Sequence, residues 1–218
     1  MILESYTPLD LFAQQFFYHN GQWLISESDH KAAKWVCYTA PKIFIGIIAG
    51  ISLMLSLLSL KITALTKWRW SLLFLALCII TVTVAAATGK AITGVRSPNE
   101  LIPFAGKYSY IGMLTHLLQY GAFDGGRSFP AGHASGGFAL MALYFMPVKK
   151  QFRYAGLALG VAAGWAMGLY QMARGEHFLT HTLTTMFLAW AIILCVNYAC
   201  ERAQSALCSG QAERRRKP

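Results

Sequence analysis

The sequence predicts an all-α membrane protein, a polytopic helix bundle, and three observations lead to this fold class. Hydrophobic residues make up 56% of the 218-residue chain and charged residues only 13%, a balance that soluble globular domains rarely show. The mean hydropathy is +0.43. Five apolar windows are each about one bilayer long, at ~20 residues per span. The apolar excess excludes a disordered chain, and the lack of a short Gly or Pro period excludes a collagen-like one.

A short amphipathic segment precedes the five windows. Thr7 and Pro8 match a helix N-cap and first helical position, and Asp10 suits the first turn. The following segment, residues 9–18, is too short to span a bilayer, so we expect it to lie along the membrane surface. The chain opens M-I-L-E-S without a basic stretch, so we expect no cleavable signal peptide. The windows that meet the length rule are residues 38–60, 70–88, 130–148, 154–171 and 178–199.

The basic residues predict how these five spans are oriented. Lys and Arg number 19 against nine Asp and Glu, which gives a net charge of +10. They cluster in the loop 61–69, in the turn after residue 148 and in the R-R-R-K tail, so these three parts belong inside. The long loop 89–129 and the turn near Gly175 then fall outside. In this setting the charge favours a bilayer and its anionic head groups as partners, and we expect no nucleic acid.

Two further patterns indicate helix packing. Gly156, Gly160, Gly164 and Gly168 recur at every fourth residue of the fourth window. Such a stripe lets a neighbouring helix approach closely, so we expect a helix contact there. The five cysteines show no metal or redox spacing, and we interpret them as packing residues.

Three polar clusters lie at the outer ends of the predicted spans. They read G-K-A-I-T-G-V-R-S-P at residues 89–98, R-S-F-P-A-G-H-A-S-G-G at 127–137 and Q-M-A-R-G-E-H-F-L-T-H-T at 171–182. Ionisable groups at a membrane edge are costly, so their positions carry information. Because all three clusters fall at the same depth, we expect them to form one shared site.

These clusters have the residue types of an anion pocket. The fixed positive charge comes from Lys90, Arg96, Arg127 and Arg174. The third window opens with a Pro-Ala-Gly turn, whose free backbone N–H groups would point outward with the positive end of the helix dipole. Gly132 lets the backbone approach an oxygen closely, because it has no side chain. Alone, a lysine or arginine at a span end is more often a membrane anchor than a ligand.

Two histidines at helix starts beside this charge indicate phosphoryl transfer. One of His133 and His177 can attack phosphorus while the other protonates a leaving oxygen. Arg and Lys donors can stabilise the transition-state oxygens, so we expect no metal and no cofactor. His133 could instead be a helix-cap residue. His177 and His181, four apart, could be a metal pair, but no third ligand lies at ligand spacing.

The three clusters, in this order and at these span ends, resemble the motifs of the type-2 phosphatidate phosphatase superfamily of integral-membrane lipid phosphatases. The resemblance covers about residues 38–199. S-F-P-A-G-H at 128–133 is similar to the family's Pro-Ser-Gly-His, with Ala131 where the family usually has Ser. G-E-H-F-L-T-H at 175–181 is similar to the third motif, in which Gly-x-His carries the nucleophile, here His177. Lys90 matches the lysine that opens the first motif.

The resemblance implies a domain organisation and a set of roles. A membrane-embedded phosphatase domain would cover residues 38–200, between a surface helix with an outer segment at 1–37 and a basic cytoplasmic tail at 201–218. His177 would form a phosphohistidine intermediate and His133 would be the general acid. The oxygen cage would consist of backbone N–H groups around Gly132 with Lys90, Arg96 and Arg174.

The chain departs from the family pattern in the first and third motifs. Where the family has an arginine before proline, this chain has Ser97, and Arg96 lies one step earlier. The family arginine six residues before the nucleophile is Gln171 here, and Arg174 lies three before.

The third departure concerns the partner of the nucleophile. The family has Asp four residues after it, holding the imidazole, and here that place is His181. A neutral imidazole can fix a tautomer through one hydrogen bond, but it does not stabilise an imidazolium as a carboxylate does. The carboxylates that could serve instead are Glu100, Asp124 and Glu176.

From these residues we expect a metal-independent hydrolase of a lipid phosphate or pyrophosphate monoester at the outer, periplasmic face of the cytoplasmic (inner) membrane. Transfer of the phosphoryl group to another lipid is a second enzymatic interpretation. A catalytically degenerate lipid-phosphate binding protein is the alternative from another class, motivated by the departures at Ser97, Ala131, Gln171 and His181. The head group stays open between lipid A, undecaprenyl pyrophosphate, phosphatidylglycerol phosphate and phosphatidate.

Overall fold

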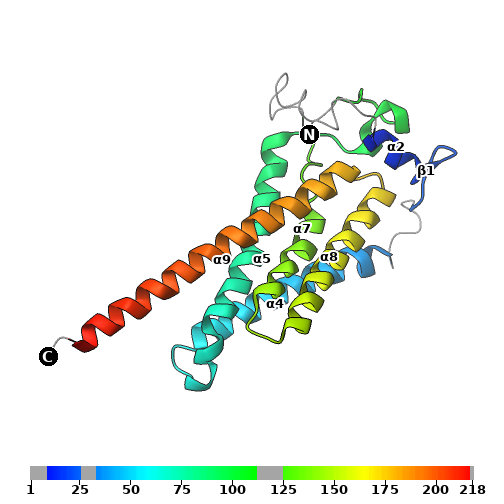
Figure 1. Ribbon diagram of the computed structural model, residues 1–218. Coiled ribbons are helices and arrows are strands. Elements are labelled where there is room, and N and C mark those ends of the chain that lie inside the picture. Colours follow the sequence, from blue (N-terminus) through cyan, green and yellow to red (C-terminus); the bar gives the residue numbers. More distant parts are fainter. Residues whose placement is uncertain (1–8, 26–32, 112–124, 217–218) are drawn as a thin grey trace.

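The computed structural model describes residues 9–25, 33–111 and 125–216, and in these ranges the chain is mostly helical (Figure 1). The all-α prediction is confirmed, apart from one two-stranded antiparallel hairpin. The long helices are α4 (Ala40–Leu58), α5 (Arg69–Thr93), α8 (Lys150–Ala173) and α9 (Leu179–Arg216). The shorter elements are α2 (Leu9–Gln15), β1 (Tyr18–His19), β2 (Gln22–Trp23), the π-helix η1 (Trp35–Thr39), α7 (Gly132–Ala139) and the 3-10 helices η2 (Thr63–Trp68), η3 (Pro98–Glu100), η4 (Ile102–Phe104) and η6 (Leu140–Phe145).

The helices alternate in direction, so their connections gather at two ends of the bundle. α5 and α8 run toward one end, and α7 and α9 run away from it (Figure 1). The described parts of the connection 94–131 and the turn 174–178 lie at this end, which we call the site end. The connections 59–68 and 146–149, which carry the predicted inside charges, lie at the opposite end. The fold therefore brings the three polar clusters to one side.

Three helical stretches in the described ranges are long and apolar enough to cross a membrane: Trp35–Leu58, Thr63–Glu100 and Leu179–Ala206. They contain the second predicted window and all but one or two residues of the first and fifth. The third window forms a helix of eight residues, α7, followed by six residues of 3-10 helix, η6. The fourth forms α8, whose 24 residues include two lysine or arginine residues in the first turn and a buried glutamine near the end. The count of five spans stays a prediction.

The core of the bundle surrounds α7, which packs against α5, α8 and α9. Its sequence G-H-A-S-G-G-F-A has only one large apolar side chain, Phe138, which is fully buried. Small residues let the neighbouring backbones approach closely, as membrane helices commonly do. α7 is thereby fixed on three sides, and its first turn, with Gly132 and His133, is held at the site end.

The predicted glycine stripe of α8 is confirmed as a packing feature. A Cβ at Gly164 would lie 2.2 Å from Phe138 Cδ1, and one at Gly160 would lie 2.3 Å from the backbone nitrogen of Met141. At Gly168 the added atom would meet Thr182 of α9 at 2.5 Å. The stripe therefore brings α8 against α7 and η6 along most of its length, and against α9 at its last turn.

The N-terminal segment differs in detail from the prediction. Its helix ends at Gln15, and Tyr18 already belongs to strand β1. The buried side of α2 is polar, with Asp10 and Gln14 at 1% and 0% exposure. Phe12 and Phe16 are exposed and contact each other at 5.3 Å between ring centroids.

The polar side of α2 docks onto the corner between α8 and α9. Asp10 accepts hydrogen bonds from the Thr180 backbone N–H, at 2.9 Å, and from the Thr180 hydroxyl. Gln14 Nε2 donates to the carbonyl oxygen of Met172 at 2.8 Å. Asp10 therefore satisfies a free N–H in the first turn of α9, which a residue of the same helix would ordinarily do. The surface segment thus supports the helix that follows His177.

Candidate active site

A buried serine hydroxyl links the second and third polar clusters at the site end. Ser128 Oγ donates to the backbone carbonyl of Glu176 at 2.6 Å. The same oxygen lies 3.1 Å from His177 Nδ1 and 3.1 Å from His181 Nδ1. All three side chains are buried: Ser128 and His177 are 2% exposed and His181 is 0% exposed. The two histidines therefore share one partner from the loop that precedes α7.

Backbone contacts hold this loop in place. The Ser128 N–H donates to the carbonyl of Val95 at 2.8 Å, and the Thr93 hydroxyl donates to the carbonyl of Phe129 at 2.5 Å. The peptide bond between Phe129 and Pro130 is cis. On the other side, the Ala131 N–H donates to the Thr185 hydroxyl of α9 at 2.8 Å. The first, second and third clusters are thus tied together by hydrogen bonds.

His133 stands beside this arrangement, in the first turn of α7. Its ring lies 6.0 Å from the His177 ring and 4.3 Å from the Tyr38 ring, between centroids. The His177 and His181 rings are 6.1 Å apart. The structure thus brings together the two histidines predicted to act in phosphoryl transfer, with the His181 ring next to that of His177.

Several buried polar atoms at this site have no hydrogen-bond partner within the described ranges. They include the ring nitrogens His133 Nδ1, His177 Nε2 and His181 Nε2, and also Arg174 Nε and Tyr170 Oη. Buried polar atoms in proteins are ordinarily paired, so a group of them in one place indicates a site that receives a polar ligand. The donors and lone pairs in this group are of the kinds that phosphoryl transfer requires.

Lys90 reaches from the last turn of α5 to the start of α7. A Cβ added at Gly132 would lie 3.0 Å from Lys90 Cε and 3.4 Å from Lys90 Nζ. The lysine stem therefore lies against the glycine backbone, and a side chain there would push it aside. The group that lies close to Gly132 in the structure is thus the Lys90 side chain, and the approach of the Gly132 backbone to a ligand oxygen stays a prediction.

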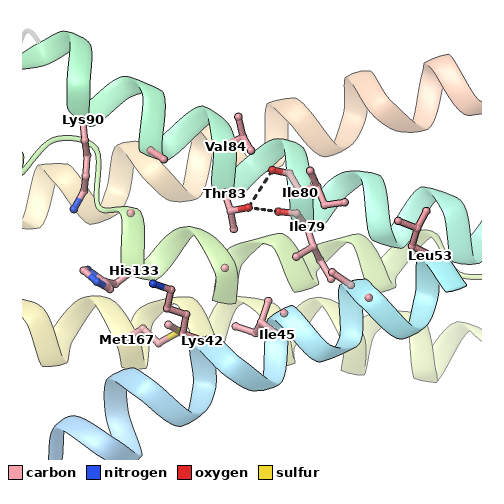
Figure 2. A pocket seen from close by; sticks show the side chains of 16 residues that line it. Lys42, Ile45, Leu53, Ile79, Ile80, Thr83, Val84, Lys90, His133 and Met167 are labelled. Atoms are coloured by element: carbon pink, nitrogen blue, oxygen red, sulfur yellow. Dashed lines mark hydrogen bonds between the residues drawn. The ribbon is translucent and has the colours of Figure 1, made fainter.

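A cavity of about 700 Å³ opens beside these residues and runs between α4 and α5 (Figure 2). One end is formed by Lys90, Gly132 and His133, and Lys42 of α4 points toward it. The rest of the wall is mostly apolar and includes Ile45, Ala49, Leu53, Ile79 and Val84. The cavity thus combines a cationic end with a long hydrocarbon wall.

The surroundings of His177 favour its neutral form. Burial lowers the pKa of His177 well below its ordinary value, and the nearby charges of Lys90, His181 and His133 lower it further. A hydrogen bond with the backbone of Ser128 raises the pKa in part. A neutral imidazole has a nitrogen lone pair, which a nucleophile needs.

The three predicted arginines lie in different surroundings, and none of them takes a position like that of Lys90 at the cavity. Arg174 is partly buried, donates to Gln171 Oε1 at 3.3 Å and lies 3.6 Å from a Glu176 carboxylate oxygen. Gln171, at the place of the family arginine, thus orients the arginine three residues later. Arg96 lies 3.6 Å from a Glu100 carboxylate oxygen and 3.3 Å above the Tyr108 ring, and Arg127 is exposed. None of the three arginines lines the cavity.

The three carboxylates proposed as substitutes for the family Asp have other positions. Glu100 accepts hydrogen bonds from the Ser97 N–H and hydroxyl, both at 2.8 Å, in a capping box. The Glu176 carboxylate faces Arg174, and only its backbone carbonyl contacts Ser128. Asp124 lies outside the described residues. In the described ranges, no group of three His, Cys, Asp or Glu side chains could hold a metal ion.

The structure adds Ser128, Lys42 and Tyr38 to the candidate site. Ser128 opens the S-F-P-A-G-H motif, but no local pattern indicated its role, because the two histidines that it contacts lie about fifty residues further along the chain. Lys42, one turn inside the first apolar window, was visible as a charge that lipid alone would not tolerate. Tyr38 gave no signal, because an aromatic residue at a span end is a common membrane anchor.

Comparison with known proteins gives one match. A family model described as the PAP2 superfamily matches residues 67–204, more than half of the chain and all three polar clusters. No curated protein and no solved structure matches the chain.

Proposed function

The chain belongs to the PAP2 superfamily, whose members are phosphatases, and on this premise we propose that it hydrolyses a lipid phosphate or pyrophosphate at the outer face of a cytoplasmic membrane. The cavity between α4 and α5 is the observation that carries the lipid assignment. A phosphate group fits its cationic end, next to Lys90 and His133, and an acyl or isoprenyl chain fits its apolar wall (Figure 2). A small soluble phosphate ester would leave that wall uncovered.

The chemistry follows from the positions of the two histidines. The lone pair of His177 Nε2 attacks phosphorus and forms the N–P bond while the P–O bond to the leaving oxygen breaks. Protonated His133 gives its proton to that oxygen. Water then attacks the phosphohistidine, transfers a proton to His133, and the electron pair of the N–P bond returns to Nε2. Phosphate is released and both histidines regain their starting states.

Positive charge stabilises the transition state in this scheme. Lys90, held against the Gly132 backbone, and the amide end of α7 lie on the His133 side. Arg174, oriented by Gln171, lies at the end of α8, in the turn that also carries His177. Lysine, arginine and backbone N–H donors can stabilise the transition-state oxygens without a metal ion.

The membrane arrangement is part of the proposal. We place five spans across the bilayer, with α7 and η6 together as the third and α8 as the fourth, and the site end outside. The three strongly apolar stretches support membrane insertion. The small residues on α7 and α8, which pack on each other, support a position inside the bundle for these two less apolar segments.

Phosphate release from the purified protein tests the proposal. The protein in detergent is incubated with each of lipid A, undecaprenyl pyrophosphate, phosphatidylglycerol phosphate and phosphatidate, with and without excess EDTA. We expect release from at least one lipid, unchanged by EDTA, and none from a His177→Ala control. Binding of a lipid without release would instead identify a degenerate binding protein. Loss of release in EDTA, restored by a divalent ion, would overturn metal independence.

A further inference from the structure

We propose that Ser128 is a positioning residue that holds His177 in the tautomer with the proton on Nδ1, so that the Nε2 lone pair is free to attack phosphorus. In this chain the serine hydroxyl would do what a carboxylate four residues after the nucleophile does elsewhere. The role of Nε2 as attacking atom rests on the proposed function, whereas the tautomer itself is a property of the resting protein.

The proton count of the Ser128 hydroxyl leads to this assignment. A hydroxyl has one proton and two lone pairs. Its proton goes to the carbonyl oxygen of Glu176, at 2.6 Å, because a carbonyl can only accept. Both contacts to the rings must then be accepted by the serine oxygen. The Nδ1 atoms of His177 and His181, each 3.1 Å away, are therefore the donors.

The other ring nitrogen of each histidine fits the same tautomer. A neutral imidazole has one N–H, so a proton on Nδ1 leaves Nε2 as a lone pair. His177 Nε2 and His181 Nε2 are both buried and have no donor or acceptor within the described ranges. A buried N–H without a partner is more costly than the alternative in which the proton is hydrogen-bonded at Nδ1. Burial and hydrogen bonding therefore favour the same tautomer.

Hydrogen bonds on both sides of Ser128 hold its hydroxyl in a fixed position relative to the two histidine rings. Its own N–H is bound to Val95, and the neighbouring residues are bound to Thr93 and Thr185. No described carboxylate contacts His177: Glu100 is paired with Ser97 and Arg96, and Glu176 with Arg174. A hydroxyl orients the ring without adding negative charge. Ser128 thus sets the orientation and the tautomer of His177, and His181 is the second ring held by the same oxygen.

The tautomer can be observed directly. The full-length protein is labelled with ¹⁵N-histidine in detergent micelles, and the His177 signals are assigned by their loss in His177→Ala. We expect a protonated Nδ1 and an unprotonated Nε2 in the wild-type protein. In Ser128→Ala, His177 should show a mixture of tautomers. A wild-type signal with the proton on Nε2 would overturn the proposal, as would an unchanged tautomer in Ser128→Ala.

Kinetics give a second, independent readout. In Ser128→Ala we expect kcat to fall about tenfold or more with little change in KM, since a lost hydrogen bond of ordinary strength carries about that factor. Ser128→Thr keeps the hydroxyl and should recover most of the rate. Ser135→Ala is the matched control: this serine is also buried, near the same motif, but its hydroxyl donates to the carbonyl of Gly132 in its own helix. Equal kcat in Ser128→Ala and Ser135→Ala would contradict the role.

The two proposals can fail separately. If the wild-type protein releases no phosphate from any lipid, the proposed function fails, and the ¹⁵N spectrum still decides the tautomer. If it is active but carries the proton on His177 Nε2, the role of Ser128 alone fails. Should Ser128→Thr not fold, the wild-type spectrum is the deciding measurement, because it needs no variant at this position.

Discussion

At the scale of single residues, the proposed chemistry depends on the different surroundings of two histidines. His177 is buried and is bound through Nδ1 to Ser128. His133 lies at the end of the cavity, where its ring contacts Tyr38. In the proposed chemistry the first environment would fix the nucleophile, and the second would give the proton donor access to the leaving oxygen of a bound lipid.

This difference predicts unequal effects of removing the two rings. His177→Ala should abolish turnover of every substrate, because no neighbouring side chain can form the covalent intermediate in its place. His133→Ala should retain more activity on an activated aryl phosphate than on a lipid monophosphate, because the aryl oxide leaves without a proton. Steady-state rates of both variants on both substrates measure the contrast. Near wild-type turnover by His177→Ala would remove His177 as nucleophile.

Lys42 provides a prediction about the head group. It is exposed on α4 and points to the cationic end of the cavity (Figure 2). Lys42→Ala should raise KM for a lipid phosphate about two- to fivefold with kcat nearly unchanged, the size expected for one exposed ion pair. Lys34→Ala, which removes an exposed lysine outside the cavity lining, is the control. An equal KM in the two variants would show that Lys42 does not contact the substrate.

At the scale of residues, the sequence predicted that the polar residues of the three motifs lie close together. Lys90, Gly132, His133, His177 and His181 come together as expected. Ser128 was not assigned a role, because its contacts to His177 and His181 span about fifty residues of chain and no local pattern encodes them.

At the scale of elements, close packing of α7 against α8 and docking of α2 onto α9 position the site. The glycine stripe was readable from the sequence, because its period is that of one helix face. The change from α-helix in α7 to 3-10 helix in η6 was not readable from the sequence, because an apolar window of this length fits either type of helix. Which side of α2 is buried was not predicted. Its polar residues find partners on α8 and α9, which the sequence of the segment does not contain.

The contact between Asp10 and Thr180 predicts a stability effect. Asp10→Ala should lower the free energy of unfolding by about 1–3 kcal/mol, because it leaves the partly buried donors of Thr180 without an acceptor. Asp10→Asn should cost less, since its amide can both accept from the N–H and donate to the hydroxyl. Thermal unfolding of the protein in detergent measures both. Equal stability of wild-type and Asp10→Ala proteins would contradict docking of α2.

The same contact predicts a pH dependence. Burial raises the pKa of Asp10, although the hydrogen bonds from Thr180 lower it in part. A carboxyl whose pKa is higher in the folded protein favours folding most in its protonated form. Its contribution is therefore full below the unfolded pKa and is lost as the pH rises through the folded pKa. The stability of the wild-type protein relative to Asp10→Asn should fall from acidic to neutral pH, and a constant difference would contradict the shift.

At the scale of the whole molecule, the alternating helices separate a basic end from the site end. The composition predicted an all-α membrane bundle, and the positions of the basic loops predicted which connections share an end of the bundle. Both predictions were possible because span length and the placement of basic residues follow from the bilayer. The site end is where the polar clusters converge (Figure 1).

Cysteine labelling tests this orientation. Ser109→Cys lies at the site end and Gln151→Cys at the first turn of α8, and both positions are exposed. In cells carrying either variant on a background without the five native cysteines, a membrane-impermeant reagent should label Ser109→Cys from outside. It should label Gln151→Cys only after permeabilisation. The reverse pattern would place the site end inside the cell.

The central claim is that His177 forms a covalent bond to phosphorus, and trapping that intermediate tests it most directly. The protein is mixed with a lipid substrate labelled with ³²P in the phosphate, quenched rapidly in denaturant at alkaline pH, and digested for peptide mapping. We predict label on the peptide that carries His177, lost on acid treatment as expected for a phosphohistidine, and absent from His177→Ala. A protein that turns over the substrate while label appears on another residue would contradict the account.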